Sequence, residues 1–405
     1  MPTPRGVADL ETILSQVWPA PHEIRVSSRL GQRGSGRTYG LLPHPRRPTL
    51  LVPTAPRRVA ARAMRGYKSP TSRAGQVRAR ALASVARAGA LHLFPWTLMI
   101  SGPTGTPSLV THIEEHLDTH LHAAIALGPP RANRKPVLQL MTSSGVPVGF
   151  VKVGVNPLTS KRVLIEARAL EYLRPLSMPG LSVPSIIDLP PWRDTAFLAT
   201  RPLNTWTSGR VDPDDLGRAL RSLATATEPL TSVLRASPWW LGLTDRLRAL
   251  DNSPESRRLR AARDVLELQI GELRIPQGPT HGDWSPWNLA VQGGHVSAWD
   301  WERFMPHAPI GYDALHYAVQ EEIRLRDKPP REALATVLER APRIVVQNGT
   351  APALSSAVFA LYLLAQGEQH LPDRPLDAGS ERGPISEWLV PVLEQATAQV
   401  DRGTQ

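Results

Sequence analysis

The stretch His281-Gly282-Asp283-Trp284-Ser285-Pro286-Trp287-Asn288, followed by Asp300-Trp301-Glu302, decides the fold that this chain is expected to adopt. Asp283 and Asn288 stand in D-x-x-x-x-N spacing, and Asp300 follows twelve residues after Asn288. Phosphoryl transfer from a nucleoside triphosphate needs a carboxylate that accepts a hydroxyl proton, together with hard oxygen ligands for Mg²⁺. These three side chains supply both kinds of group.

A β-hairpin is expected to bring the three side chains together. Residues 289–292 and 295–299 are short strand-like runs on either side of two adjacent glycines, which tolerate the positive φ of a tight turn. Antiparallel pairing around that turn sets Asn288 next to Asp300, close to Asp283. The alternative is two polar loops and a glycine turn with no shared role.

This block resembles the aminoglycoside phosphotransferase and choline kinase-like superfamily, whose catalytic loop reads H-G-D-x-x-x-x-N and whose second metal motif reads D-x-E or D-x-D. The resemblance implies an α+β, bilobal protein-kinase-like fold with a small antiparallel-sheet N-lobe and a mostly helical C-lobe. It implies that Asp283 is the catalytic base and that His281 braces the loop. Asn288 and Asp300 would bind Mg²⁺. Asp313 matches a family aspartate that ties the loop to a helix.

Length and composition predict a cytoplasmic globular enzyme. The chain has 405 residues, of which 41% are hydrophobic and 20% charged, enough for a substantial core. It contains no cysteine, which excludes disulfides and cysteine-based zinc sites. The N-terminus lacks the apolar run of a signal peptide, and the longest apolar stretch, 88–100, is too short to span a bilayer. We therefore expect no transmembrane segment.

Three parts are expected along the chain: a basic N-terminal extension of strands and then helices (1–105), a kinase-like N-lobe (106–205) and a helical C-lobe that holds the catalytic loop (206–405). The net charge is +11 and is unevenly distributed. Residues 1–100 hold fifteen arginines and one lysine against three acidic residues, a net charge of +13. The excess positive charge therefore belongs to the extension.

Residues 56–93 form a basic, amphipathic helical stretch within this extension. Arg73, Arg80 and Arg87 recur every seven residues. The apolar residues expected on another side are Val77, Ala81, Leu82, Val85 and Ala88. One interpretation is peripheral contact with an anionic surface. The favoured alternative is a solvated arginine face on a helix packed against the body. Nucleic acid is not expected, because no aromatic residues alternate with these arginines.

The helix predicted at 108–121 contains His112-Ile113-Glu114-Glu115-His116, which matches the H-x-x-E-H motif of inverted zinc proteases. Two histidines at positions i and i+4 can share a metal ion. So short a motif often arises by chance, and no distal ligand accompanies it. A zinc protease is therefore a remote alternative, and histidines that flank a buried stripe are favoured.

A nucleotide loop is expected between the first two of three predicted strands, at 128–134. The three strands are 124–127, 136–141 and 148–153. The loop is not a G-x-G-x-x-G sequence, and its two prolines have no amide donors. Its grip on phosphate would depend on Arg131, Asn133 or Arg134.

Lys152, at the end of the third strand, is the predicted ligand of the α- and β-phosphates. The chain has five lysines against 42 arginines, and one of the five stands where a compact cation suits phosphate. Glu166 on the next helix is its expected partner, as in kinases, with Glu171 as the second choice. The alternative is an edge lysine and a solvated glutamate. By resemblance, the backbone near Thr200 would bind adenine.

The predicted reaction transfers the γ-phosphoryl group of ATP, held with Mg²⁺, to a hydroxyl of a small molecule: a sugar, amino sugar or amino alcohol. A sugar is preferred, because the C-terminal third has no dense acidic cluster to attract a cationic antibiotic. Trp284 and Trp287 either stack on the acceptor or belong to the core. ATP and GTP are not distinguished. The alternative function is a non-catalytic, kinase-like protein that binds nucleotide or a partner.

Overall fold

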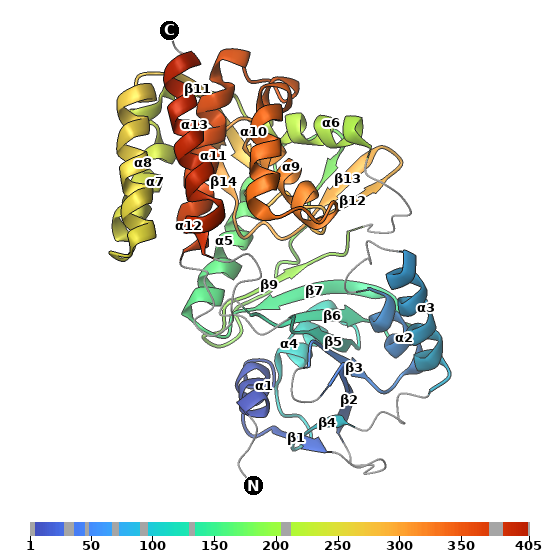
Figure 1. Ribbon diagram of the computed structural model, residues 1–405. Helices are drawn as coiled ribbons and strands as arrows, with labels where there is room; N and C mark the ends of the chain where they lie inside the picture. Colours follow the sequence, from blue (N-terminus) through green and yellow to red (C-terminus); the bar gives the residue numbers. More distant parts are fainter. Residues whose placement is uncertain are drawn as a thin grey trace. The chain divides into compact units, whose positions relative to one another are not determined.

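The computed structural model describes residues 5–27, 36–44, 48–66, 73–89, 96–128, 134–203, 212–371 and 384–403. The chain divides into two compact units, which comprise residues 1–171 with 184–203, and residues 172–183 with 204–405. The first unit is dominated by an antiparallel sheet and the second by helices (Figure 1). The predicted α+β class is confirmed.

One eight-stranded sheet, in the order β1-β4-β2-β3-β5-β6-β7-β9, forms the frame of the first unit. Its strands are β1 (Glu23–Ser27), β2 (Arg37–Leu42), β3 (Leu50–Pro53), β4 (Thr97–Ser101), β5 (His122–Ala126), β6 (Val137–Met141), β7 (Pro147–Val153) and β9 (Phe197–Thr200). The strands before residue 105 extend the sheet of the expected N-lobe through the β3–β5 pair. This pairing satisfies the backbone groups of β5 that would otherwise be an open edge.

Two sets of helices cover the two faces of this sheet (Figure 1). Helices α1 (Arg5–Ser15) and α4 (Leu109–Leu117) share one apolar cluster with Leu51 of β3. Helix α2 (Arg57–Gly66) shares a second apolar cluster with Val52, which follows Leu51 in β3. Successive side chains of a strand point to opposite faces, so β3 is buried on both sides.

The prediction of which side of the basic helix is buried is wrong. Helix α3 (Arg73–Arg87) buries Ala83 and Ala86, which are each 1% exposed. Val77 and Val85, expected on the packed side, are 64% and 41% exposed. Alanines allow α3 to approach α2 closely, and this close contact decides which face is buried.

Helix α5 (Pro157–Leu173) follows β7 and carries Glu166. The segment 183–187 forms an isolated bridge to β9, between Ile186 and Thr200. Pro184 cannot donate a backbone hydrogen bond, which limits ladder formation in that segment.

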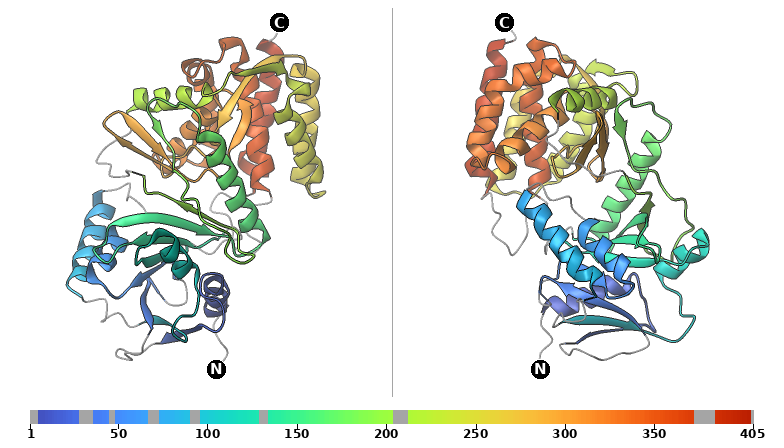
Figure 2. Two further views of the ribbon diagram at one scale, coloured as in Figure 1. Left: turned by 180° about the vertical axis from the view of Figure 1, so that it is seen from behind. Right: turned by 90° about the vertical axis from the view of Figure 1, so that its right-hand side faces the viewer.

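The second unit is built around α11 (Ser355–His370), most of whose side chains are buried. The other helices are α6 (Pro213–Ala224), α7 (Pro238–Ala249), α8 (Pro254–Ile270), α9 (Tyr312–Arg324), α10 (Pro330–Gln347), α12 (Ile385–Trp388) and α13 (Val390–Gly403). Helices α8, α11 and α13 pack side by side, as two further views show (Figure 2). Among the described residues, no helix is both long and apolar enough to cross a membrane.

The predicted catalytic loop, residues 281–288, connects two small sheets. The first contains β10 (Leu230–Val233), β11 (Arg274–Thr280) and β14 (Met305–Pro309). The second contains β12 (Leu289–Gln292), β13 (His295–Ala298) and β8 (Leu181–Ser182), which runs parallel to β13. The β12–β13 pairing confirms the predicted hairpin and its register.

Candidate active site

Asp283 lies on the loop between β11 and β12, and one of its carboxylate oxygens is hydrogen-bonded. Its Oδ1 accepts the Ser285 hydroxyl at 2.5 Å and lies 3.0 Å from Nε2 of His316. The Asp283 side chain is 28% exposed. Burial acts to raise the pKa of Asp283, but the His316 hydrogen bond and charge, the Arg303 charge and the Ser285 hydroxyl together hold it below its ordinary value. Asp283 is therefore ionised at neutral pH.

His281, the first residue after β11, is fully buried and links the loop to the residue that follows β13. Its Nε2 lies 3.0 Å from the carbonyl oxygen of Trp299, and its Nδ1 accepts the backbone N–H of Asp283 at 3.2 Å. These partners define a neutral ring that carries its proton on Nε2. Burial lowers the pKa of His281 to about 4. The rings of Trp284 and Trp301 lie against it, with centroids at 5.7 and 4.4 Å.

Asp313, at the start of α9, holds the loop by its backbone. Its carboxylate accepts the N–H of His281 at 2.7 Å and that of Gly282 at 2.9 Å. Gly282 has φ +83°, and a Cβ built there would lie 2.1 Å from the carbonyl oxygen of Arg303. Position 282 therefore requires glycine, because of its left-handed backbone conformation and because there is no room for a Cβ.

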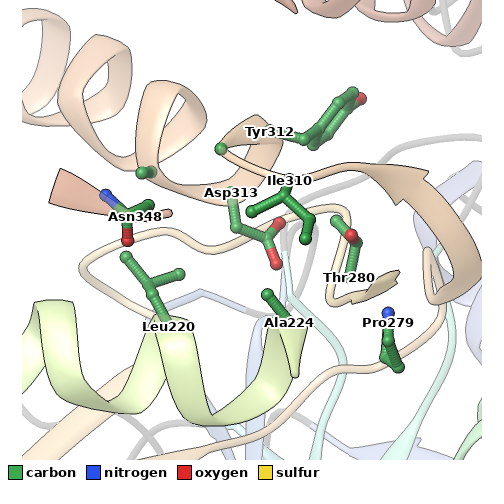
Figure 3. A pocket seen from close by; sticks show the side chains of 10 residues that line it. Leu220, Ala224, Pro279, Thr280, Ile310, Tyr312, Asp313 and Asn348 are labelled. Carbon is green, nitrogen blue, oxygen red and sulfur yellow. The ribbon is translucent and has the colours of Figure 1, made fainter. Parts of the chain in front are cut away.

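A small pocket lies behind the loop, where the Asp313 carboxylate points between Leu220 and Ala224 of α6 on one side and Thr280 on the other (Figure 3). Its cavity volume of about 20 Å³ suffices for one water molecule. Burial in this wall raises the pKa of Asp313 to about 7, despite the two backbone donors. The pocket is a structural feature and is too small for a nucleotide.

Asn288 and Asp300 flank the open end of the hairpin. The carbonyl oxygen of Asn288 accepts the backbone N–H of Trp299 at 3.1 Å, the residue before Asp300. The Asn288 side-chain amide donates to the carbonyl oxygen of Asp283 at 3.0 Å. Asp300 has φ +73°, a conformation that is uncommon outside glycine and often marks functional sites.

Further side chains around Asp283 were not anticipated from the sequence. His316 contacts Asp283 directly, and its Nδ1 lies 3.2 Å from the hydroxyl of Tyr362. Arg303 contributes its charge to Asp283. His316 follows Asp313 by one helical turn, so the i, i+3 spacing places both on the same face of α9. That spacing is the signal that sequence reasoning could have used.

The predicted nucleotide residues of the first unit lie on β7, α5 and β9. Lys152 Nζ lies 2.6 Å from both carboxylate oxygens of Glu166, which is 2% exposed. Thr200 lies opposite Phe150 in the β7–β9 ladder. Arg131 and Asn133 lie outside the described residues.

The zinc interpretation of the H-x-x-E-H helix is not supported by its contacts. His112 Nε2 lies 3.1 Å from the carbonyl oxygen of Pro190, and its ring lies against Trp192 with centroids 5.2 Å apart. Within the described part of the chain, no group of three or more His, Asp or Glu side chains is placed to hold a metal ion. His112 is a packing residue of α4.

The two tryptophans of the loop differ in environment. Trp284 is fully buried, which excludes direct stacking on a ligand, because its ring is packed against His281. Trp287 is 41% exposed, on the loop between Asp283 and Asn288. Of this pair, Trp287 is the one whose ring is accessible from solvent.

Comparisons with known proteins give one family match. Residues 150–345 match the model of the APH phosphotransferase enzyme family. A search of the curated proteins found no match. The similar solved structures include a thermostable mutant of aminoglycoside phosphotransferase APH(4)-Ia, with 14% identity, 72% of this chain and 98% of that chain covered, and a TM-score of 0.48. Another is a putative fructosamine-3-kinase from Thermobifida fusca YX-ER1, with 15% identity, 72% and 99% coverage, and a TM-score of 0.45.

The matched segment, 150–345, contains Lys152, Glu166, Thr200 and every predicted residue of the catalytic loop and hairpin. Residues 150–345, just under half of the chain, thus match the phosphotransferase enzyme family, in agreement with the resemblance that the H-G-D-x-x-x-x-N loop indicates.

Proposed function

We propose that this protein is a kinase that transfers the γ-phosphoryl group of ATP to a hydroxyl of a sugar, amino sugar or amino alcohol. The observation that carries the proposal is the register of the β12–β13 hairpin, which sets Asn288 opposite Trp299 and thus beside Asp300. The same loop presents the ionised Asp283. A base and two hard oxygen ligands at one end of a hairpin are the groups that phosphoryl transfer needs.

Asp283 is the proposed catalytic base. The acceptor hydroxyl loses its proton to this carboxylate while its oxygen forms a bond to the γ-phosphorus, and the bond from that phosphorus to the β-phosphate oxygen breaks to release ADP. A carboxylate with a low pKa is ionised before the substrate arrives. Its partial exposure leaves room for a hydroxyl group.

The residues present fit a magnesium ion. Asn288 uses its amide nitrogen within the loop, so its side-chain oxygen is the atom that remains for a cation. Asp300 supplies a carboxylate, and both are hard oxygen ligands of the kind that Mg²⁺ prefers. When bound, Mg²⁺ would neutralise charge on the β- and γ-phosphates. Asn288 and Asp300 are its proposed ligands.

Lys152 is the proposed ligand of the α- and β-phosphates, and its ion pair with Glu166 supports this role. The pair of 2.6 Å contacts holds the ammonium group at the end of β7. In kinases, a strand lysine paired with a helix glutamate positions the nucleotide phosphates. The backbone near Thr200 on β9 is the proposed adenine contact, and Arg131 and Asn133 are proposed as further phosphate contacts.

For the acceptor, Trp287 is the proposed stacking residue. Its exposed ring lies in the loop that carries the base, and an aromatic face packs well against a sugar ring or a cationic head group. A sugar hydroxyl is the preferred acceptor.

The test is ADP release from ATP and Mg²⁺ against a panel of sugars, amino sugars and amino alcohols. Asp283→Asn should abolish acceptor-dependent ADP release, while Asp264→Asn, on the exposed side of α8, should not change it. ADP release that Asp283→Asn leaves unchanged would overturn the catalytic proposal. MgATP binding without turnover in the wild type would favour the non-catalytic alternative.

We also propose that residues 56–93 make peripheral contact with an anionic surface. Arg80 and Arg87 are exposed beside Val77 and Val85, so cationic and apolar side chains share the solvent-facing side of α3. Sedimentation with vesicles of anionic lipid should pull down the wild type and not Arg80→Glu/Arg87→Glu. Equal sedimentation of both proteins would contradict this contact.

A further inference from the structure

Asp283, His316 and Tyr362 form a chain of side-chain contacts that runs from the loop into the core of the second unit. Nε2 of His316 lies 3.0 Å from Asp283 Oδ1, and Nδ1 lies 3.2 Å from the Tyr362 hydroxyl. The His316 and Tyr362 rings also contact each other edge to face, with centroids 6.0 Å apart. His316 is thus held from both ring nitrogens.

Oδ1 of the Asp283 carboxylate accepts two hydrogen bonds. An ionised carboxylate can only accept hydrogen bonds, so Nε2 of His316 must donate to Oδ1. The Ser285 hydroxyl donates to the same Oδ1 at 2.5 Å. Among the described residues, no donor is placed on the other oxygen, Oδ2. The two oxygens of Asp283 are therefore chemically unequal before any substrate binds.

The far end of the chain is closed to solvent. Tyr362 is 1% exposed on α11, and His316 is 4% exposed on α9. A proton passed from Asp283 to His316 would reach only buried groups. The chain is therefore suited to holding the carboxylate in place and is not a route for protons to solvent.

We infer that His316 is a positioning residue, which fixes the Asp283 carboxylate so that Oδ2 alone receives the proton of the acceptor hydroxyl. The inference rests on the proposed role of Asp283 as the base. Without the donor from α9, Oδ1 keeps only the Ser285 hydroxyl of these two donors, so the carboxylate is less firmly held about its last side-chain bond. The fraction of encounters with a correctly placed oxygen then falls. An error of about 1 Å in such a group can reduce turnover by about 100-fold.

The test compares His316→Gln with His316→Leu. Glutamine retains an N–H donor of similar reach, whereas leucine has similar bulk and no donor. With the acceptor that the panel identifies, or with water as acceptor, His316→Leu should lower kcat by about 10- to 100-fold and leave KM for MgATP unchanged. His316→Gln should recover part of that loss. Tyr362→Phe should have a smaller effect in the same direction, and His22→Gln, in the first unit, should have none.

A second readout does not depend on turnover. In protein labelled with ¹⁵N-histidine, the His316 ring signal, identified by its loss in His316→Gln, should shift in Asp283→Asn. An unshifted signal, or equal kcat for His316→Leu and wild type while Asp283→Asn is inactive, would overturn the inference alone. If Asp283→Asn instead released ADP as fast as the wild type, the proposed function would be overturned.

Discussion

The carboxylate of Asp313 accepts the backbone N–H groups of two consecutive residues, His281 and Gly282, at 2.7 and 2.9 Å. Asp313→Ala should therefore leave two buried donors without their acceptor and reduce the free energy of unfolding by about 2–4 kcal/mol. Asp313→Asn should be nearly as destabilising, because its amide group places a donor against one of these donors. Urea unfolding measures the loss. Asp245→Asn, with a 76% exposed side chain, is the control and should change stability little.

Stability should also depend on pH through Asp313, with a sign opposite to that of an ion-paired aspartate. Its pKa is about 7 in the folded protein and 3.8 as the ordinary value, so between these values the folded chain keeps a proton that the unfolded chain has lost. The contribution of this group therefore falls as pH rises from about 4 to about 7. The difference in unfolding free energy between wild type and Asp313→Asn should shrink over that range. A difference that grows with pH would contradict the burial argument.

His281 should remain neutral in the folded protein well below its ordinary pKa. The folded value of about 4 lies under the ordinary 6.5, so in this window the unfolded chain binds the extra proton. The stabilisation is complete above pH 6.5 and is lost as pH falls toward 4. An NMR titration should show the His281 ring signal, assigned by its loss in His281→Gln, unchanged from pH 8 to about 5.5. A midpoint near 6.5 would disprove this.

Gly282→Ala should damage the loop far more than alanine at another glycine of left-handed conformation. A Cβ at Gly282 meets the Arg303 carbonyl oxygen at 2.1 Å, whereas a Cβ at Gly293, with φ +58°, meets nothing within 4 Å. Gly293→Ala should lose only about 1–2 kcal/mol from its conformation. Thermal unfolding of both variants makes the comparison, and equal losses would show that space at Gly282 is not limiting.

Trp284 and Trp287 should respond oppositely to truncation. Trp284→Ala removes a fully buried ring from against His281 and should destabilise the protein by about 3–5 kcal/mol. Trp287→Ala, at a position 41% exposed, should leave stability nearly unchanged and raise KM for the acceptor. Unfolding curves and steady-state kinetics separate the two effects. Unchanged kinetics in Trp287→Ala would remove that ring from the acceptor site.

Substitutions at Lys152 should separate its contribution to stability from its contribution to nucleotide binding. Lys152→Ala leaves Glu166, 2% exposed, without this cation and should cost about 3–5 kcal/mol. The double variant Lys152→Met/Glu166→Leu replaces the pair with apolar side chains and should recover most of that stability. It should not recover binding of a fluorescent ATP analogue. Binding by the double variant at wild-type strength would exclude Lys152 as a phosphate ligand.

Local patterns predicted the parts of this molecule that local physics determines. The glycine pair after Gln292 fixed both strands of the hairpin, and the spacing in the loop placed Asn288 at its base. Lys152 and Glu166 were paired from their order along the chain, and the structure places them in contact. The roles of these residues remain predictions.

Contacts between distant segments were beyond the reach of the same reasoning. The side chain of His316 approaches Asp283 from a helix 33 residues later, and its second partner, Tyr362, is a further 46 residues away. The orientation of α3 was mispredicted for a related reason. Valines suggested the buried face, but the neighbouring α2 accepts the smaller alanines, and this preference is visible only when both helices are present.

The parallel pairing of β8 with β13 has a practical consequence for dissecting the protein. Because residues 172–183 belong to the second unit, the polypeptide passes from one unit to the other at three points. A fragment cut after residue 203 would carry β8 away from its partner and expose an unpaired strand. Separate expression of the sheet unit therefore calls for excising 172–183 and closing the gap with a designed connection, and the helical unit calls for that short segment to be grafted back.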